Sequence, residues 1–260
     1  MWFGHSWGAQ IATFTDNIAV DARALATRLD QAGFVCLENV VSPDWLARAR
    51  AHVHALVRTH GKKFFVIIRP ADERPSVASE VAHHPLIRGL LRELTEIACP
   101  RGIVEWEDVY NTLRVVAGSN GQKGSCEFHY DASVITALVP ISIPEAQDGR
   151  SGELVISPNR RGYRNLLVNL VEKAVVQSNP YRRAMAQKFD GDPEGSRRIL
   201  KPGNIYLFWG YRSYHGNMPC PDHGLRATLL LHYGNPHGRR TVLQTFRNIR
   251  KLIESRRITH

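Results

Sequence analysis

A histidine and an aspartate stand two residues apart at the start of a long apolar stretch, "CEFHYDASVITALVPISIP", at residues 126–144. Side chains alternate between the two faces of a strand, so Glu127, His129 and Asp131 are predicted to share one face. An imidazole and a carboxylate that converge in this way can hold two neighbouring positions on a metal ion. The triplet alone is a weak signal, because a histidine in a strand is more often a core or surface residue than a ligand. Support must come from elsewhere in the chain.

The stretch "LKPGNIYLFWGYRSYHGNMPCPDHGLRATLLLHYGNP" provides that support. It predicts a turn, an apolar strand, a short loop that carries His215, and a further strand that begins near Arg226. Two histidines and one carboxylate on one face of a metal leave positions open, as in non-haem Fe(II) oxygenases. A 2-oxoacid can fill two open positions and dioxygen the third. The planar guanidinium of Arg226 suits the far carboxylate of such an acid, and Thr228 can donate a further hydrogen bond from the same face.

In this order and at this spacing, His129-x-Asp131, His215 and Arg226-x-Thr228 resemble the motif of the Fe(II)/2-oxoglutarate-dependent dioxygenases. The segment "DQAGFVCLENVVSPDWLARAR" also looks like the opening of the phytanoyl-CoA dioxygenase-like branch. The segments "FHYDASVITALVPISIP" and "GELVISPN" are similar to small amino-acid hydroxylases and halogenases of the lysine-halogenase type. The resemblance implies a mainly β fold with flanking helices, a double-stranded β-helix (jelly roll, cupin-like). It also implies Fe(II) bound by the two histidines and the aspartate, 2-oxoglutarate bound by Arg226 and Thr228, and O2 as oxidant.

The resemblance further implies the type of reaction. Halogenases of this superfamily carry glycine or alanine in place of the metal-binding carboxylate, whereas Asp131 is intact here. Hydroxylation of an unactivated C–H bond in a small molecule is therefore predicted, and desaturation or ring closure stays open. The substrate that the resemblance suggests is an amino acid or a biosynthetic intermediate derived from one.

Several other side chains are candidates for substrate binding. A carboxylate among them would favour a free amine, and arginines would favour a carboxylated or phosphorylated substrate. For each of them a solvated or core position is the alternative. The candidates are Glu127, Asn111, Arg114, Arg69, Arg74, His232 and Trp209.

The rest of the chain predicts the elements that position these residues. Without repeats or Gly/Ser linkers, one domain over residues 1–260 is the default. A helical flank with a first strand is predicted over 1–108, with helices at 43–58 and 85–98. The jelly-roll core is predicted over 109–236, with a mostly helical insertion near 160–198 that is a candidate lid. A basic amphipathic C-terminal helix is predicted at 237–260.

Composition and charge leave other functions open. The net charge of +10 allows a nucleic-acid partner, so an oxidative nucleic-acid demethylase is one alternative. Such demethylases usually carry a second arginine six residues after the first, where this chain has His232, so a nucleic-acid partner is not favoured. A non-catalytic metal-binding jelly roll is the other alternative. Scattered cysteines and the lack of an apolar span predict a cytoplasmic protein with no membrane segment, acting on a small molecule; a homodimer stays open.

Overall fold

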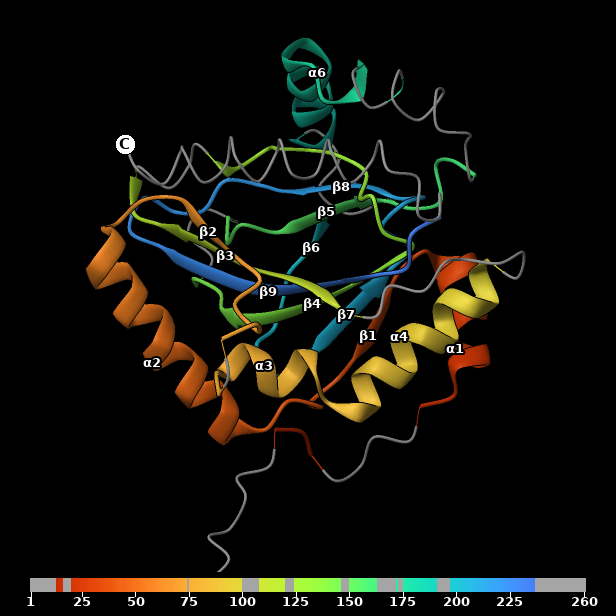
Figure 1. Cartoon of the computed structure of the whole chain (residues 1–260). Coiled ribbons are helices and arrows are strands. Elements are labelled where there is room, and N and C mark those ends of the chain that lie inside the picture. Colours follow the sequence, from red (N-terminus) through yellow and green to blue (C-terminus); the bar gives the residue numbers. More distant parts are fainter. Residues whose placement is uncertain are drawn as a thin grey trace, which may run out of the picture.

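The fold was examined in a computed structural model, which describes residues 13–15, 20–73, 75–99, 108–119, 124–145, 150–162, 172, 175–190 and 197–236. The predicted C-terminal helix at 237–260 lies outside the described residues, as does Arg74. Figure 1 shows layers that run from four helices, through a large sheet and a small sheet, to a further helix at the opposite side. No helix among the described residues is long and apolar enough to cross a membrane.

The four helices that cover one face of the large sheet begin at clear capping residues. Ser42 caps α2 through its side chain, which accepts from the Trp45 backbone N–H, and Pro43 takes the first helical position. Pro85 opens α4 in the same way after His84. The helices are α1 (Ala22–Ala32), α2 (Pro43–His60), α3 (Val77–Ala82) and α4 (Pro85–Ala98). The helices expected at 43–58 and 85–98 are thus confirmed, and α3 was not predicted.

Two antiparallel sheets form the core of the fold. The large sheet has the order β1-β7-β4-β9-β3-β2, and the small sheet has the order β6-β5-β8. This is the jelly-roll architecture expected from the sequence. The large sheet contains β1 (Val35–Leu37), β2 (Phe65–Ile68), β3 (Tyr110–Ala117), β4 (Ile135–Ser142), β7 (Ile205–Phe208) and β9 (Leu225–Tyr233). The small sheet contains β5 (Leu154–Ser157), β6 (Arg197–Arg198) and β8 (Tyr214–Asn217).

Strand register decides which residues of the large sheet face the helices and which face the small sheet. On the helix side, strand residues such as Leu229 and Val115 join a buried cluster with Trp45 of α2. On the other side, Leu138 of β4 and Ile156 of β5 share a second buried cluster between the two sheets. Residues directly opposite each other on antiparallel strands share a face. The site must therefore be built from positions on the second face.

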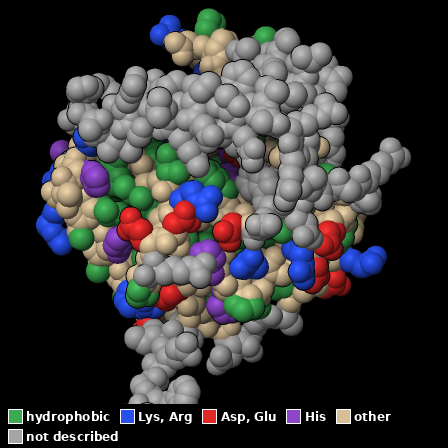
Figure 2. All heavy atoms as spheres, in the orientation of Figure 1, with side chains coloured by type: hydrophobic (Ala, Val, Ile, Leu, Met, Phe, Trp, Pro, Cys, Tyr) green, Lys and Arg blue, Asp and Glu red, His purple; other side chains and the backbone are tan. Residues whose placement is uncertain are grey.

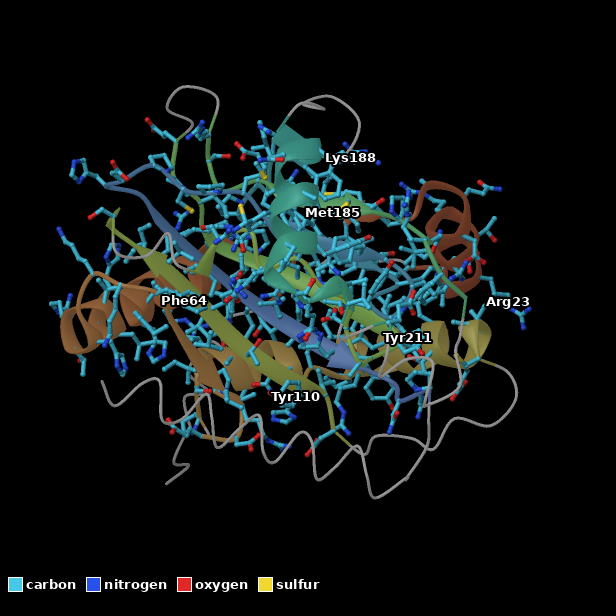
Figure 3. The ribbon with its side chains drawn as sticks, turned by 90° about the horizontal axis from the view of Figure 1, so that it is seen from above. Arg23, Phe64, Tyr110, Met185, Lys188 and Tyr211 are labelled. Carbon is cyan, nitrogen blue, oxygen red and sulfur yellow. The ribbon has the colours of Figure 1, made fainter. Side chains whose placement is uncertain are left out.

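The insertion contributes α6 (Asn179–Asp190), which lies over the outer face of the small sheet (Figures 1 and 3). Met185 of this helix packs on a buried cluster that contains Phe128 and Tyr214. The guanidinium of Arg182 donates to the carbonyl oxygen of Phe128 at 3.2 Å. The helical character expected for the insertion holds for α6. Because Phe128 precedes His129, the helix supports the segment that carries the predicted metal ligands.

The charged side chains on the described part of the face in Figure 2 are of mixed sign rather than uniformly basic. Figure 2 shows Lys and Arg side chains interspersed with Asp, Glu and His side chains on the described part of one face. Ion pairs such as Arg48 with Glu80, at 2.6 Å, offset part of the positive charge locally. The net charge of +10 therefore does not gather into one basic patch on that part of the surface.

Candidate metal centre

Backbone pairing brings the two histidines together from segments far apart in the sequence. His129 and His215 form an antiparallel bridge, with N–H to O distances of 2.9 and 3.0 Å. The backbone N–H of Asp131 donates to the carbonyl oxygen of Gly210 at 3.0 Å. The sequence prediction was wrong in two details: His215 lies in β8 and not in a loop, and the strand β4 begins only at Ile135. The bridge, and not a continuous strand, places His129 beside His215.

Three potential metal-binding atoms converge at this point. Ligand atoms of His129, Asp131 and His215 all lie within 4.8 Å of one another. The Nε2 atom of His129 is 3.4 Å from Oδ1 of Asp131, and Nε2 of His215 is 3.5 Å from Oδ2. The imidazole rings have centroids 4.6 Å apart. The predicted triad is thus assembled in space as the sequence spacing suggested.

The histidines are also held in the tautomer that a metal requires. Nδ1 of His129 lies 2.8 Å from the carbonyl oxygen of Glu127, and Nδ1 of His215 lies 3.0 Å from that of Ser213. A carbonyl oxygen only accepts, so each Nδ1 carries the proton and each Nε2 presents a lone pair. Metal-binding histidines commonly donate their other N–H in this way. The donor set of two imidazoles and one carboxylate therefore fits a divalent metal with open positions.

The protonation states suit the same conclusion. Burial lowers the pKa of His215 to about 4, although the charge of Asp131 opposes this shift. Burial works to raise the pKa of Asp131, but the nearby imidazoles of His215 and His232, together with a hydrogen bond from His232, hold that pKa well below its usual value. At neutral pH the site thus combines a neutral His215 with an ionised carboxylate. A buried carboxylate in this state favours a cation beside it.

The predicted cosubstrate arginine lies inside the fold. Arg226 is 2% exposed, and its Nε donates to the carbonyl oxygen of Gly152 at 2.9 Å. Its Nη1 lies 3.4 Å from the hydroxyl of Thr228, which is also buried. Burial lowers the pKa of Arg226 to about 10, so it stays charged at neutral pH. No carboxylate of the described residues lies within ion-pair distance of Arg226, although the charge of the buried Glu153 acts on it from further away. A carboxylate that reached Arg226 directly would therefore find a buried cation that is not already engaged in an ion pair.

Two residues beside Asp131 complete the site, and the sequence pattern identified only one of them. Nδ1 of His232 is 3.5 Å from Oδ2 of Asp131, which places this candidate next to the triad. The hydroxyl of Thr136 donates to the same Oδ2 at 2.5 Å. Thr136 was not predicted, because a threonine in a strand of apolar residues gives no sign of a role. Its position opposite His232 in the pairing of β4 with β9 could have pointed to a role, but this pairing can be recognised only once the strand register is known.

Of the remaining substrate candidates, Arg114 and Glu127 lie together near the triad. Arg114 is the cross-strand partner of Thr228, so its side chain leaves β3 on the inner face. Its Nη2 lies 3.6 Å from the Glu127 carboxylate, which is 36% exposed. Glu127 also supplies the carbonyl oxygen that orients His129. The two opposite charges thus lie on the same side of the fold as the triad.

Two other substrate candidates, Asn111 and Trp209, face away from the site. Asn111 lies on the helix side of β3, where its amide oxygen accepts from the backbone N–H of Ala71 at 2.9 Å. Trp209 packs in the cluster beneath the helices, and its indole donates to Asp30 at 3.0 Å. Arg69 is paired with Asp72 at 2.5 Å. Asn111 and Trp209 thus take the core positions that were the alternative to substrate binding, because each lies an odd number of positions from residues that face inward.

Comparison with solved structures confirms the fold. HygX from Streptomyces hygroscopicus, with nickel and 2-oxoglutarate bound, aligns with a TM-score of 0.56 at 13% identity, covering 84% of this chain and 88% of that chain. AviO1 from Streptomyces viridochromogenes Tue57 gives 0.56 at 13% identity, covering 86% and 99%. The non-heme alpha ketoglutarate dependent carbocyclase SnoK from nogalamycin biosynthesis gives 0.53 at 13% identity, covering 90% and 92%. No protein-family model and no curated protein matches the sequence.

Proposed function

We propose that this protein is an Fe(II)- and 2-oxoglutarate-dependent oxygenase that hydroxylates a C–H bond of a small molecule. The observation that carries the proposal is that one fold holds both a potential Fe(II) site, the triad, and a buried cation suited to the far carboxylate of 2-oxoglutarate, Arg226. A triad of two histidines and one carboxylate is suited to Fe(II), and the buried Arg226 forms no ion pair with a carboxylate of the described residues. The solved structures support it, since one contains 2-oxoglutarate and another is described as alpha ketoglutarate dependent.

In the proposed enzyme, each residue of the chain has a defined role. His129 and His215 bind Fe(II) through Nε2, because carbonyl oxygens hold the proton on Nδ1 of each ring. Asp131 supplies the carboxylate ligand. Arg226 binds the far carboxylate of 2-oxoglutarate, and Thr228 lies beside it. Iron and 2-oxoglutarate, with O2, supply the oxidation of the C–H bond.

The substrate that we infer is an amino acid or a molecule derived from one. Arg114 and Glu127 offer a cation and an anion on the side of the sheet that carries the triad. A zwitterion can satisfy both groups, its carboxylate at Arg114 and its ammonium at Glu127. Hydroxylation is the preferred outcome because Asp131 is intact, which disfavours halogenation. The phytanoyl-CoA dioxygenase-like branch remains a prediction from the N-terminal segment.

The test begins with metal-free protein under nitrogen, to which Fe(II) and then 2-oxoglutarate are added. A weak visible charge-transfer band that saturates at one equivalent of each is expected. The Asp131→Ala variant should lose the band, and Arg226→Met should need far more 2-oxoglutarate to reach it. Amino acids are then screened for stimulation of succinate release, with Glu127→Gln as the matched variant for amine recognition. No band in the wild-type protein, with iron and cosubstrate intact, would refute the proposal.

A further inference from the structure

The second oxygen of the Asp131 carboxylate is held by a chain of side chains from the large sheet. The Thr136 hydroxyl lies 2.5 Å from Oδ2, and Nδ1 of His232 lies 3.1 Å from the same hydroxyl oxygen. An ionised carboxylate only accepts, so the threonine donates its proton to Asp131. Its oxygen can then accept from the Nδ1–H of His232. With the proton on Nδ1 of His232, which also lies 3.3 Å from the Ser133 hydroxyl, the hydrogen bonds run in one direction from His232 through Thr136 to Asp131, and each strengthens the next.

Gly210, in the loop that precedes His215, packs directly against the hydrogen bond between Thr136 and Asp131. A Cβ atom on Gly210 would lie 2.4 Å from the Thr136 hydroxyl oxygen and 2.6 Å from Oδ2 of Asp131. Such distances are too short for any side chain, so only glycine leaves room for the pair. The carbonyl oxygen of Gly210 also accepts from the Asp131 backbone N–H at 3.0 Å. Gly210 thus holds the backbone of Asp131, and Thr136 holds its side chain.

We propose that Thr136, supported by His232, is a positioning residue that keeps Oδ2 of Asp131 from the metal and leaves Oδ1 as the single coordinating oxygen. This inference rests on the proposed metal site. Thr136 is fully buried, so its hydroxyl has no water to compete for it. A hydrogen bond from a hydroxyl to a carboxylate is among the strong, short ones. It lowers the donor strength of Oδ2 and fixes the plane of the carboxylate.

The number of coordinating oxygens decides how many positions stay open. Two histidines and one carboxylate oxygen leave three of six positions on an octahedral metal, whereas a carboxylate bound through both oxygens leaves two. A 2-oxoacid that chelates through two atoms, together with O2, needs three. The Thr136 hydroxyl would thus keep the third position available. Nothing in the sequence motif itself specifies this, since the motif names only the ligands.

The inference is tested with Mn(II) as the probe and without substrate turnover. The enhancement of water-proton relaxation by protein-bound Mn(II) reports the number of water molecules on the metal. For Thr136→Val, which keeps the shape and removes the donor, the relaxivity per bound Mn(II) should fall by about a third, because one of three water positions is lost. Thr136→Ser keeps the hydroxyl and should match the wild type. Thr95→Val makes the same change at a buried threonine whose hydroxyl has no partner, and should also match.

The outcomes separate this inference from the proposed function. If wild-type protein does not bind Mn(II), or binds it equally well after His129→Ala, the metal site itself is refuted. If wild-type binding is normal but Thr136→Val has unchanged relaxivity, or Thr136→Ser falls as far as Thr136→Val, the positioning role alone is refuted. Loss of all Mn(II) binding in folded Thr136→Val would equally overturn it, because the hydroxyl would then be needed for binding. Thr136→Ala, which introduces no added bulk, decides the matter should the valine variant not fold.

Discussion

The buried, neutral His215 predicts a specific loss of stability when the metal-free protein is acidified. Burial lowers its pKa from 6.5 to about 4, and the side chain is 5% exposed. Between these two values the unfolded chain takes up a proton that the folded protein refuses, so stability falls as pH decreases. At about pH 5 the loss relative to about pH 7.5 is about 2 kcal/mol from this residue alone.

The pH window distinguishes His215 from its neighbour Asp131, because the stabilising contributions of both are lost as pH falls. The pKa of Asp131 is held well below its ordinary value of 3.8, so its stabilising contribution is present above that value and is lost only as pH falls through the lower, folded pKa. The window of His215 lies above it, from about 6.5 down to about 4. A measurement that stops at about pH 5 therefore leaves Asp131 ionised. Burial also lowers the pKa of His84, so the contribution of His215 is taken as the difference between the wild type and a variant at position 215.

Urea unfolding with a chelator present measures this loss at the two pH values. The His215→Gln variant should lose about 2 kcal/mol less on acidification than the wild type, whatever its stability at neutral pH. The His54→Gln variant changes an exposed histidine of α2 and should behave as the wild type does. An equal pH dependence in wild type and His215→Gln would refute the reasoning, since it would mean that His215 is protonated in the folded protein or is not buried.

Three further variants test the site and its support. Arg226→Met should weaken the binding of 2-oxoglutarate by about 2 to 5 kcal/mol, roughly 30-fold or more, and leave the affinity for Fe(II) unchanged, as measured with the charge-transfer band. Equal 2-oxoglutarate affinities in the variant and the wild type would contradict the role of Arg226 in binding a carboxylate. Gly210→Ala should weaken Mn(II) binding by about tenfold or more, whereas Gly162→Ala, which meets nothing within 4 Å, should not. Trp45→Ala should cost about 3 to 5 kcal/mol in urea unfolding, because this fully buried side chain joins α2 to the sheet; a loss below about 1 kcal/mol would contradict that packing.

The sequence predicted the ligands better than it predicted the backbone that carries them. Metal chemistry and the family motif restrict residue type, order and spacing, so His129, Asp131 and His215 were identified as candidate ligands from the sequence. The helix starts at Ser42 and His84 were equally accessible, because capping and proline placement act locally. Local rules are what a sequence states most directly. The bridge between His129 and His215 depends on pairing across more than eighty residues, which no local rule describes.

The residues that were misplaced show which information was lacking. Asn111 and Arg114 are three positions apart on one strand, so both cannot face the pocket, and alternation alone would have separated them. Deciding which of the two faces inward required the pairing of Arg114 with Thr228. Thr136 could be predicted even less well from the sequence than Asn111 and Arg114. Its position is defined by a hydrogen bond to a residue five places earlier and by a cross-strand partner, His232, and neither is visible as a pattern.

The charges buried in this fold explain why metal and cosubstrate belong together. Asp131 is an ionised carboxylate surrounded by imidazoles, of which His215 is neutral, and Arg226 is a buried cation without a carboxylate partner among the described residues. Each buried charge costs free energy, since the interior replaces water poorly, although Glu153 offsets part of the charge of Arg226 and Thr136 donates to Asp131. A divalent cation offsets the first charge and the far carboxylate of a 2-oxoacid offsets the second. Because a 2-oxoacid also chelates the metal through its other end, one ligand joins both compensations, and each ligand should bind more tightly when the other is present.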